Sequence, residues 1–348
     1  MKNQIKKIAW SVITLLIVGT ILLGCTSAPK AATTTSSTEV VQKKTRVAYV
    51  SYLAIDSAEW LQNLEAGLKD YQATHPNIEV KVVEALQASD YEPKTRALAE
   101  EGYDIIITGY AVMAEATIAV ANDYPDIKFG SLDGRINNLS SYKNIQEFAL
   151  NRTETGYLAG IVAGMMTKVN KVGIVGGSDV GAINEIIAGW QQGMRRINPN
   201  IEDLVVYANT FTDPTVGKEL GLALVAKGAD IIAAAAGGTG VGTVQAAAAS
   251  NVPFVAWDVH YQDVLGKLEL GSAVNFFDKM VITFIENTIA GNFKGGTRTE
   301  YGLSDGVCGF EILDNSLANK QAIKDAIAAA SADIASGKVV ISKELIHK

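Results

Sequence analysis

Short apolar runs alternate with amphipathic segments along most of the chain from residue 46 onward. Runs that are apolar throughout are typical of strands in parallel sheets, which are covered by helices on both faces. The segments between them repeat their apolar positions with the period of a helix. We therefore predict an α/β protein with strands at 47–53, 78–83, 103–108, 127–132, 171–175, 204–207, 230–236 and 253–257. Helices are predicted at 59–71, 113–122, 153–167, 182–197, 216–227 and 319–335.

Two of these helices begin with capping signals. Asn151 and Glu154 have the spacing of a capping box, and Asp213 precedes a proline that suits the first position of a helix. The alternation of strands and helices breaks near 144–151, 268–275 and 297–302. We interpret the breaks as three crossings between two Rossmann-like lobes. The predicted lobes are 46–148 with 274–297, and 149–273 with 300–348; ligands of such sheets bind beyond the carboxyl ends of the strands, here in a shared cleft.

The start of the chain differs from the rest. Residues 1–7 carry three lysines, an apolar stretch follows at 8–23, and small residues end it, which is typical of an export signal. The stretch is shorter than the roughly 20 residues that a spanning helix needs, so we favour a cleaved signal peptide (1–24) over a transmembrane anchor. Leu-Leu-Gly-Cys resembles a bacterial lipobox, which implies lipidation of Cys25. The small polar residues at 25–45 predict a flexible tether.

Composition and charge exclude several classes of function. The formal net charge is −7, and removal of 1–24 with its three lysines leaves −10. Because a nucleic-acid binder shows a basic face, we expect no nucleic-acid partner. The three histidines lack ligand spacing, and Cys308 has no partner once Cys25 is acylated, so we expect no metal, no cofactor and no disulfide. The nucleophile elbow and the P-loop are absent from the sequence, and we predict no enzymatic activity.

Several stretches occur in an order and spacing that are specific when taken together. They are Tyr-Pro-Asp-Ile-Lys-Phe-Gly-Ser-Leu-Asp at 124–133, Thr-Gly-Tyr-Leu-Ala-Gly at 155–160 within 155–164, Lys-Val-Gly-Ile-Val-Gly-Gly at 171–177, Gly-Trp-Gln-Gln-Gly at 189–193 with Asn198 and Pro199, and Gly-Ala-Asp-Ile-Ile at 228–232 before Gly-Gly-Thr-Gly at 237–240. Over about 46–312 the chain resembles the basic membrane protein family, nucleoside-binding lipoproteins (the purine-nucleoside receptor group) of ABC importers. The resemblance implies a periplasmic-binding-protein type I fold and a monomeric receptor for a nucleoside or related small molecule. It also implies ABC permease subunits as partners, and a lipid anchor on the extracytoplasmic face of the cell membrane.

Candidate ligand residues of the first lobe follow its strands. The family has an aspartate in the loop of Asp56 and usually phenylalanine at Trp60, which implies ligand contact and stacking. Asp56 could instead form a capping box with Glu59, and Trp60 could simply pack in its lobe. Tyr110 follows the third strand and either faces the cleft or packs beneath it. Asp133 matches a family aspartate, with a turn residue as the alternative.

The second lobe supplies the other candidates. Asp258 follows the strand at 253–257 and matches the aspartate that the family uses for ribose hydroxyls; capping of the next loop is the alternative. Gly238 and Thr239 belong to a glycine-rich turn at a helix start, whose backbone N–H groups could bind polar ligand edges or serve the turn alone. Phe211 could supply a ring to the cleft or pack in the core or hinge.

Three positions depart from the family pattern. Residues 233–236 are alanines where relatives usually place an aromatic, Asn275 stands where they usually have lysine, and Leu61 stands where they often have asparagine. One stacking face and one cation are therefore missing, which leaves a purine nucleoside, another nucleoside, a free base or another small neutral molecule as ligands. Few Arg or Lys residues lie in the candidate loops, which disfavours a phosphorylated ligand.

Two other functions compete with that of a binding protein whose lobes close on the ligand. The first is an NAD-dependent enzyme, because Gly238, Gly240 and Asp258 have the spacing of a dinucleotide fingerprint. Thr243 occupies the place of the third glycine of that fingerprint, which argues against this function. A surface adhesin or signalling lipoprotein without transport is the remaining alternative, because one fold serves many functions.

Overall fold

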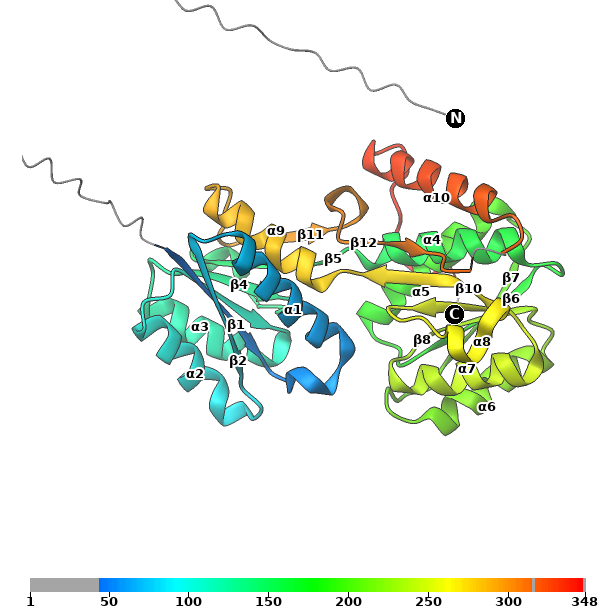
Figure 1. Cartoon of the computed structure of the whole chain (residues 1–348), viewed down its shortest axis with the longest axis horizontal. Coiled ribbons are helices and arrows are strands. Elements are labelled where there is room, and N and C mark those ends of the chain that lie inside the picture. Colours follow the sequence, from blue (N-terminus) through cyan, green and yellow to red (C-terminus); the bar gives the residue numbers. More distant parts are fainter. Residues whose placement is uncertain (1–43, 315–316, 347–348) are drawn as a thin grey trace, which may run out of the picture. The chain divides into compact units, whose positions relative to one another are not determined.

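The structure is a computed structural model that describes residues 44–314 and 317–346 (Figure 1). The predicted signal peptide, Cys25 and nearly all of the predicted tether lie outside these residues. No helix within the described part is both long enough and apolar enough to cross a membrane.

The first sheet has six strands, all parallel, in the order β11-β5-β4-β3-β1-β2. Its strands are β1 (Thr45–Ser51), β2 (Ile78–Glu84), β3 (Ile105–Gly109), β4 (Lys128–Leu132), β5 (Ile145–Leu150) and β11 (Arg298–Tyr301). Its helices are α1 (Glu59–Thr74), α2 (Ala88–Glu100), α3 (Ala114–Asp123) and α9 (Phe277–Ile289). Helices α1 and α9 share one core cluster on one face, and α2 and α3 share another on the opposite face.

The second sheet repeats this arrangement in the order β12-β10-β9-β8-β6-β7, with β12 antiparallel to β10 and the other pairs parallel. Its strands are β6 (Lys171–Gly176), β7 (Glu202–Tyr207), β8 (Ile231–Ala235), β9 (Phe254–Trp257), β10 (Glu269–Asn275) and β12 (Cys308–Glu311). Its helices are α4 (Arg152–Met166), α5 (Gly181–Ile197), α6 (Pro214–Ala226), α7 (Gly238–Ser250), α8 (Gln262–Leu265) and α10 (Lys320–Ala335). The prediction of an α/β protein with parallel sheets is confirmed.

The chain passes between the sheets after β5, after β10 and after β11. β11 extends to Tyr301 and pairs with β5, so the chain leaves the first sheet at the end of the predicted break at 297–302. The reason is that Arg298–Tyr301 completes the edge of the first sheet before the chain leaves it. We call the first sheet with its helices lobe one and the second lobe two; their movement against each other stays a prediction.

The predicted helix caps differ in outcome. The Asp213 carboxylate accepts hydrogen bonds from the N–H groups of Thr215 (2.9 Å) and Val216 (3.3 Å), as predicted. Asn151 forms no capping box, because its own N–H donates to the Tyr301 carbonyl. Its side-chain Nδ2 instead donates to Glu154 Oε1 at 2.8 Å.

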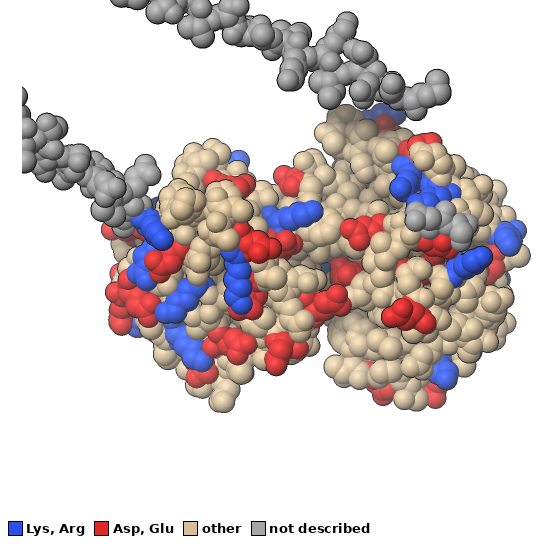
Figure 2. Space-filling model, viewed as in Figure 1, with Lys and Arg blue, Asp and Glu red and all other residues tan. Residues whose placement is uncertain are grey.

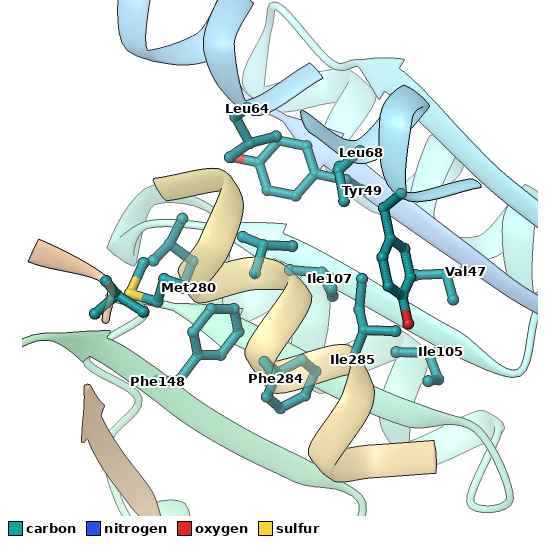
Figure 3. Close-up of a cluster of buried hydrophobic side chains, with 14 of the residues drawn as sticks. Val47, Tyr49, Leu64, Leu68, Ile105, Ile107, Phe148, Met280, Phe284 and Ile285 are labelled. Carbon is teal, nitrogen blue, oxygen red and sulfur yellow. The ribbon is translucent and has the colours of Figure 1, made fainter. Parts of the chain in front are cut away.

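The core of lobe one is assembled from both ends of the lobe's sequence (Figure 3). Alternate residues Val47 and Tyr49 of β1 point to the same face, as the period of a strand requires. Phe284 of α9 lies on this face and stacks on Phe148 of β5, with the ring centroids 4.4 Å apart. Residues near 280 are therefore as much a part of this core as residues near 50.

In lobe two, α4 and α5 cross at backbone contact. A Cβ on Gly160 of α4 would lie 2.2 Å from the carbonyl oxygen of Trp190 in α5. A Cβ on Gly193 of α5 would lie 2.1 Å from the carbonyl oxygen of Tyr157 in α4. Both distances are far below van der Waals contact, so only glycine permits this packing. The motif stretches at 155–164 and 189–193 thus build a helix pair.

Candidate functional site

A cleft of about 810 Å³ lies between the two lobes, within the usual size range of small-molecule sites. Lobe one contributes the start of α1, and the start of α9 after the second crossing forms a further part of the wall. Lobe two contributes the loops that follow β8 and β9. This is the edge at which parallel strands end, so the topology places the cleft where open α/β sheets bind ligands.

Aromatic rings stand on both sides of the cleft. The Trp60 ring of α1 is supported by Phe277 at 4.9 Å and by Tyr110 at 5.9 Å between ring centroids. Phe211 of lobe two lines the cleft with 41% of its surface exposed. A Cβ on Gly177 would lie 2.1 Å from the Phe211 ring, so glycine at this position makes room for it. The flat face of a planar ligand fits between such rings.

Strand-end residues adopt a rare backbone conformation around the cleft. Tyr110, Asp133 and Asp258 directly follow β3, β4 and β9, and their φ angles are +64°, +53° and +61°. Residues with a side chain seldom occupy this left-handed region. The conformation lets each strand end abruptly and turns the next side chain out of the strand's alternation.

Asp258 lies on the cleft with its carboxylate bound on one side. Oδ1 accepts a hydrogen bond from Asn275 Nδ2 at 2.7 Å. The residue is open to the cleft, but the walls around it limit hydration of the charge, and this raises the pKa of Asp258 to about 6. The side-chain and backbone hydrogen bonds from Asn275 and the more distant charge of Arg152 act in the opposite direction. The carboxylate is thus ionised at neutral pH and, with about four acceptor sites, can still accept from a ligand.

Asp133 has a different environment. It is buried, it pairs with Arg152, and its Oδ1 accepts from Arg298 Nη2 at 3.1 Å. Burial opposes ionisation of this carboxyl, but the two guanidinium groups outweigh it and hold the pKa of Asp133 below its usual value. Glu147 joins the network through Arg298 at 3.3 Å. Asp133 therefore ties β4 to α4 and β11 and is not part of the cleft wall.

Three further candidates also lie outside the wall. Tyr110 stands behind Trp60 and contacts Tyr52. The Thr239 hydroxyl is buried, accepts from the Asp213 N–H at 3.0 Å and donates to a backbone oxygen in the loop before α6. Asp56 lies in a separate hollow of about 540 Å³, and α1 begins without the side-chain capping bond that the alternative interpretation of Asp56 predicts.

The structure therefore brings five of the nine candidates to the cleft and leaves four outside its wall. Those at the cleft are Trp60, Phe211, Gly238, Asp258 and Asn275. Ligand contact by any of the nine stays a prediction.

Sequence reasoning missed other residues of the wall. Asn63 lines the cleft one turn after Trp60, and its i, i+3 spacing on α1 was a usable signal. Leu61, the position compared with the family asparagine, is instead fully buried. His260 lines the cleft and pairs with the buried Glu269, a partner that no local pattern indicates.

The cleft is acidic. Glu59, Asp258, Asp278 and Glu311 belong to its wall, and none of the described residues that line it is Lys or Arg. Figure 2 shows acidic side chains where the two lobes face each other. An anionic ligand would meet repulsion here without a cation to offset it, whereas a neutral or cationic ligand would not.

Comparisons with known proteins agree with this geometry. The Lactococcus lactis "ABC transporter nucleoside-binding protein BmpA" is 30% identical over 272 residues, which are 73% of this chain and 75% of that protein. The "CD4+ T-cell-stimulating antigen" of Listeria innocua is 31% identical over 253 residues, 67% of this chain and 69% of that protein.

A solved structure shows the same fold. The solute-binding protein of an ABC transporter system from Conexibacter woesei has a TM-score of 0.71 at 22% identity, covering 86% of this chain and 98% of that one. The predicted fold, of periplasmic-binding-protein type I, is confirmed. The family model of PnrA-like ABC transporter substrate-binding proteins matches residues 44–344. The chain therefore belongs to this family, the basic membrane protein family that its motifs resembled.

Proposed function

We propose that the chain is the lipid-anchored receptor of an ABC importer and that it binds a nucleoside or nucleobase between its lobes. The observation that carries this proposal is the combination of rings from both lobes, Trp60 and Phe211, with the ionised Asp258 in one cleft. A flat base suits the rings, and a ribose hydroxyl suits a carboxylate oxygen as acceptor. The name of the Lactococcus relative supports the same ligand class.

The division of the contacts between lobes supports a closing mechanism. A ligand shifts a conformational equilibrium only by its differential affinity for the two states. A base that touches Trp60 in lobe one and Phe211 and Asp258 in lobe two gains all its contacts only when the lobes are close together. The closed form would then dock on the permease, and no catalytic step is proposed.

The acidic wall narrows the ligand class. Glu59, Asp258 and Glu311 would repel a phosphate, so we propose that nucleotides are excluded and that uncharged nucleosides or bases are accepted. A micromolar dissociation constant corresponds to about 8 kcal/mol. Stacking at about 1–3 kcal/mol per contact, with one or two charge-assisted hydrogen bonds, can reach this value when closure removes water.

Residues 1–45 support the proposed location. The lysine-rich start, apolar stretch and Leu-Leu-Gly-Cys sequence predict cleavage before Cys25 and attachment of acyl chains there. A tether of about 20 residues would hold the folded part roughly 25 Å from the membrane, within reach of a permease. Mass spectrometry of the purified N-terminus would detect the lipid on Cys25.

A thermal-shift screen of the chain from residue 26 tests the ligand. The panel contains nucleosides, their monophosphates, free bases, sugars and amino acids. A ligand at 100 times its Kd adds about 2.7 kcal/mol of stability, so nucleosides or bases should raise the melting temperature while the matched monophosphates should not. A shift with sugars or amino acids alone would overturn the ligand class. No shift with any compound would favour the adhesin or signalling alternative.

A further inference from the structure

A chain of polar side chains runs from the cleft into the hinge. Asn275, at the end of β10, donates from Nδ2 to Asp258 Oδ1 at 2.7 Å. Its Oδ1 accepts from the Thr155 hydroxyl of α4 at 3.0 Å. Thr155 also lies near the buried Cys308 thiol of β12, and it lowers the pKa of that thiol against the larger effect of burial. β12 lies beside β10 with Asn275 and Cys308 opposite each other (Figure 1).

The chemistry of these groups fixes the direction of every hydrogen bond. A carboxylate can only accept, so Asn275 must present its amide NH₂ to Asp258 and its carbonyl oxygen to Thr155. The Thr155 hydroxyl must then donate to that oxygen, which leaves its own oxygen to accept. Burial raises the pKa of Cys308 to about 12, so the group beside Thr155 is an uncharged thiol.

We propose that Thr155 is a positioning residue for the binding site. It holds the Asn275 amide in the orientation that donates to one oxygen of Asp258 and thereby stabilises the carboxylate that accepts from the ligand. That Asp258 accepts a hydrogen bond from the ligand rests on the proposed function, whereas the positioning of Asn275 by Thr155 can be tested without ligand.

These residues also lie next to the three segments of the chain that join the lobes. Thr155 follows the first crossing, Asn275 ends the strand before the second, and Cys308 begins the strand after the third. Beside Thr155, Glu154 Oε2 accepts from the N–H of Leu303 at 2.7 Å, which binds α4 to the third crossing. The donor to Asp258 is thus held by α4, which is itself bound to the third crossing.

Other charged or titratable groups also act on Asp258. Arg152 from α4 attracts its charge at longer range, and Tyr261 from the next loop couples to it. The remaining groups of this kind in the cleft wall are Glu59 from α1, His260 after β9, Asp278 from α9 and Glu311 from β12. A variant that alters only the Asn275 orientation leaves all of them in place.

The test is the pKa of Asp258 in the ligand-free mature chain, measured from its carboxyl carbon by NMR and assigned with Asp258→Asn. Thr155→Val removes the hydroxyl at nearly constant shape and frees the amide to rotate, so the pKa should rise by about one unit. Thr155→Ser should restore it. Thr155→Ala also lacks the hydroxyl but favours a helix, so the Asp258 pKa should rise in this variant even where the valine variant folds poorly.

Thr117→Val is the matched control, because it also removes a buried threonine hydroxyl, in lobe one, that donates within its own helix region at 2.8 Å. An unchanged Asp258 pKa in folded Thr155→Val or Thr155→Ala would overturn the proposal, as would an equal rise in Thr117→Val. Nucleoside affinity of Thr155→Val at pH 6 should be about two- to threefold weaker than that of the unmodified chain, since less of Asp258 is ionised. Failure of the unmodified chain to bind any nucleoside would instead reject the proposed function and leave the pKa result intact.

Discussion

Replacing Asp258 with asparagine keeps the shape of the side chain and removes its charge from the cleft. Asn275 donates to the carboxylate from its side chain, to Oδ1 at 2.7 Å, and from its backbone, and a carboxylate with about four acceptor sites can still accept from a ligand hydroxyl. The substitution converts one charge-assisted hydrogen bond, worth about 1.5–3 kcal/mol, into a neutral one of about 0.5–1.5 kcal/mol. The loss is about 1–1.5 kcal/mol, so the nucleoside Kd at pH 8 should rise about five- to twelvefold.

The pH dependence makes this prediction specific. Because the pKa of Asp258 is about 6, its carboxylate is ionised above pH 6 and protonated below it. Nucleoside affinity should be constant above about pH 7 and should fall as the pH drops through 6, whereas Asp258→Asn should show no such fall. The two proteins should therefore converge near pH 5.

Isothermal titration calorimetry at pH 5, 6, 7 and 8 provides the assay, with a nucleoside that does not titrate in this range. His260→Gln is the control, because it removes the imidazole of the cleft wall and should keep the fall at pH 6. The folded state holds the Asp258 proton more tightly than the unfolded chain does, so ionisation costs stability as the pH rises toward 6 and beyond. The ligand-free asparagine variant should accordingly melt no lower than the unmodified chain at pH 8. Equal affinities at pH 8, or an affinity of the unmodified chain that does not change with pH, would refute this reasoning.

Three more predictions follow from the packing and the charges. Gly160→Ala would place a Cβ 2.2 Å from the Trp190 carbonyl oxygen, so urea denaturation should show that the free energy of unfolding falls by about 2 kcal/mol even after the gain in helix propensity. Gly181→Ala is the control, because its Cβ would meet only a guanidinium at 3.6 Å, and it should leave the stability unchanged or raise it. Trp60→Ala should weaken nucleoside binding about 5- to 150-fold in calorimetry through the lost stacking of about 1–3 kcal/mol, and Trp60→Phe should recover most of it; an unchanged Kd would remove Trp60 from the site. Asp133→Asn should cost about 3 kcal/mol at pH 7 by breaking its ion pairs. Folding lowers the pKa of this carboxyl, so the stability cost of the substitution should decrease as the pH falls below 3.8 and vanish once the group is protonated in the folded state as well. A large change in nucleoside affinity in this variant would make Asp133 a ligand residue again.

Much of the architecture could be predicted because buried parallel strands leave a local signal. Every strand predicted from an apolar run is present, with ends that differ by a few residues. The breaks near 144–151, 268–275 and 297–302 coincide with β5, β10 and β11, the strands that lead into the crossings. α2 was missed because its sequence is largely polar and contains Pro93, so it lacks a clear apolar period.

The site was harder to predict than the fold. Asp133 and Asp258 both follow a strand and both have positive φ, and nothing local separates them. The difference comes from remote partners: Arg298, 165 residues from Asp133, reaches its carboxylate, while Asn275 binds one oxygen of Asp258. Sequence patterns locate strand ends, but the choice of which end faces the cleft depends on contacts between distant segments.

The order of the chain has a consequence for how the molecule is made. The chain leaves the sheet of lobe one after Leu150, yet the core of this lobe also contains Phe284 and Tyr301, and its edge strand is β11. All of lobe two up to β10 is synthesised in between. A chain that emerges with its N-terminus first, from a ribosome or a translocation channel, therefore exposes half-built apolar surface until about residue 301 has appeared. Contacts of such sequence separation fold slowly, and an interrupted chain is prone to aggregate. Fragments cut at residue 150 should not fold separately, and truncation before β11 should leave lobe one with an open core.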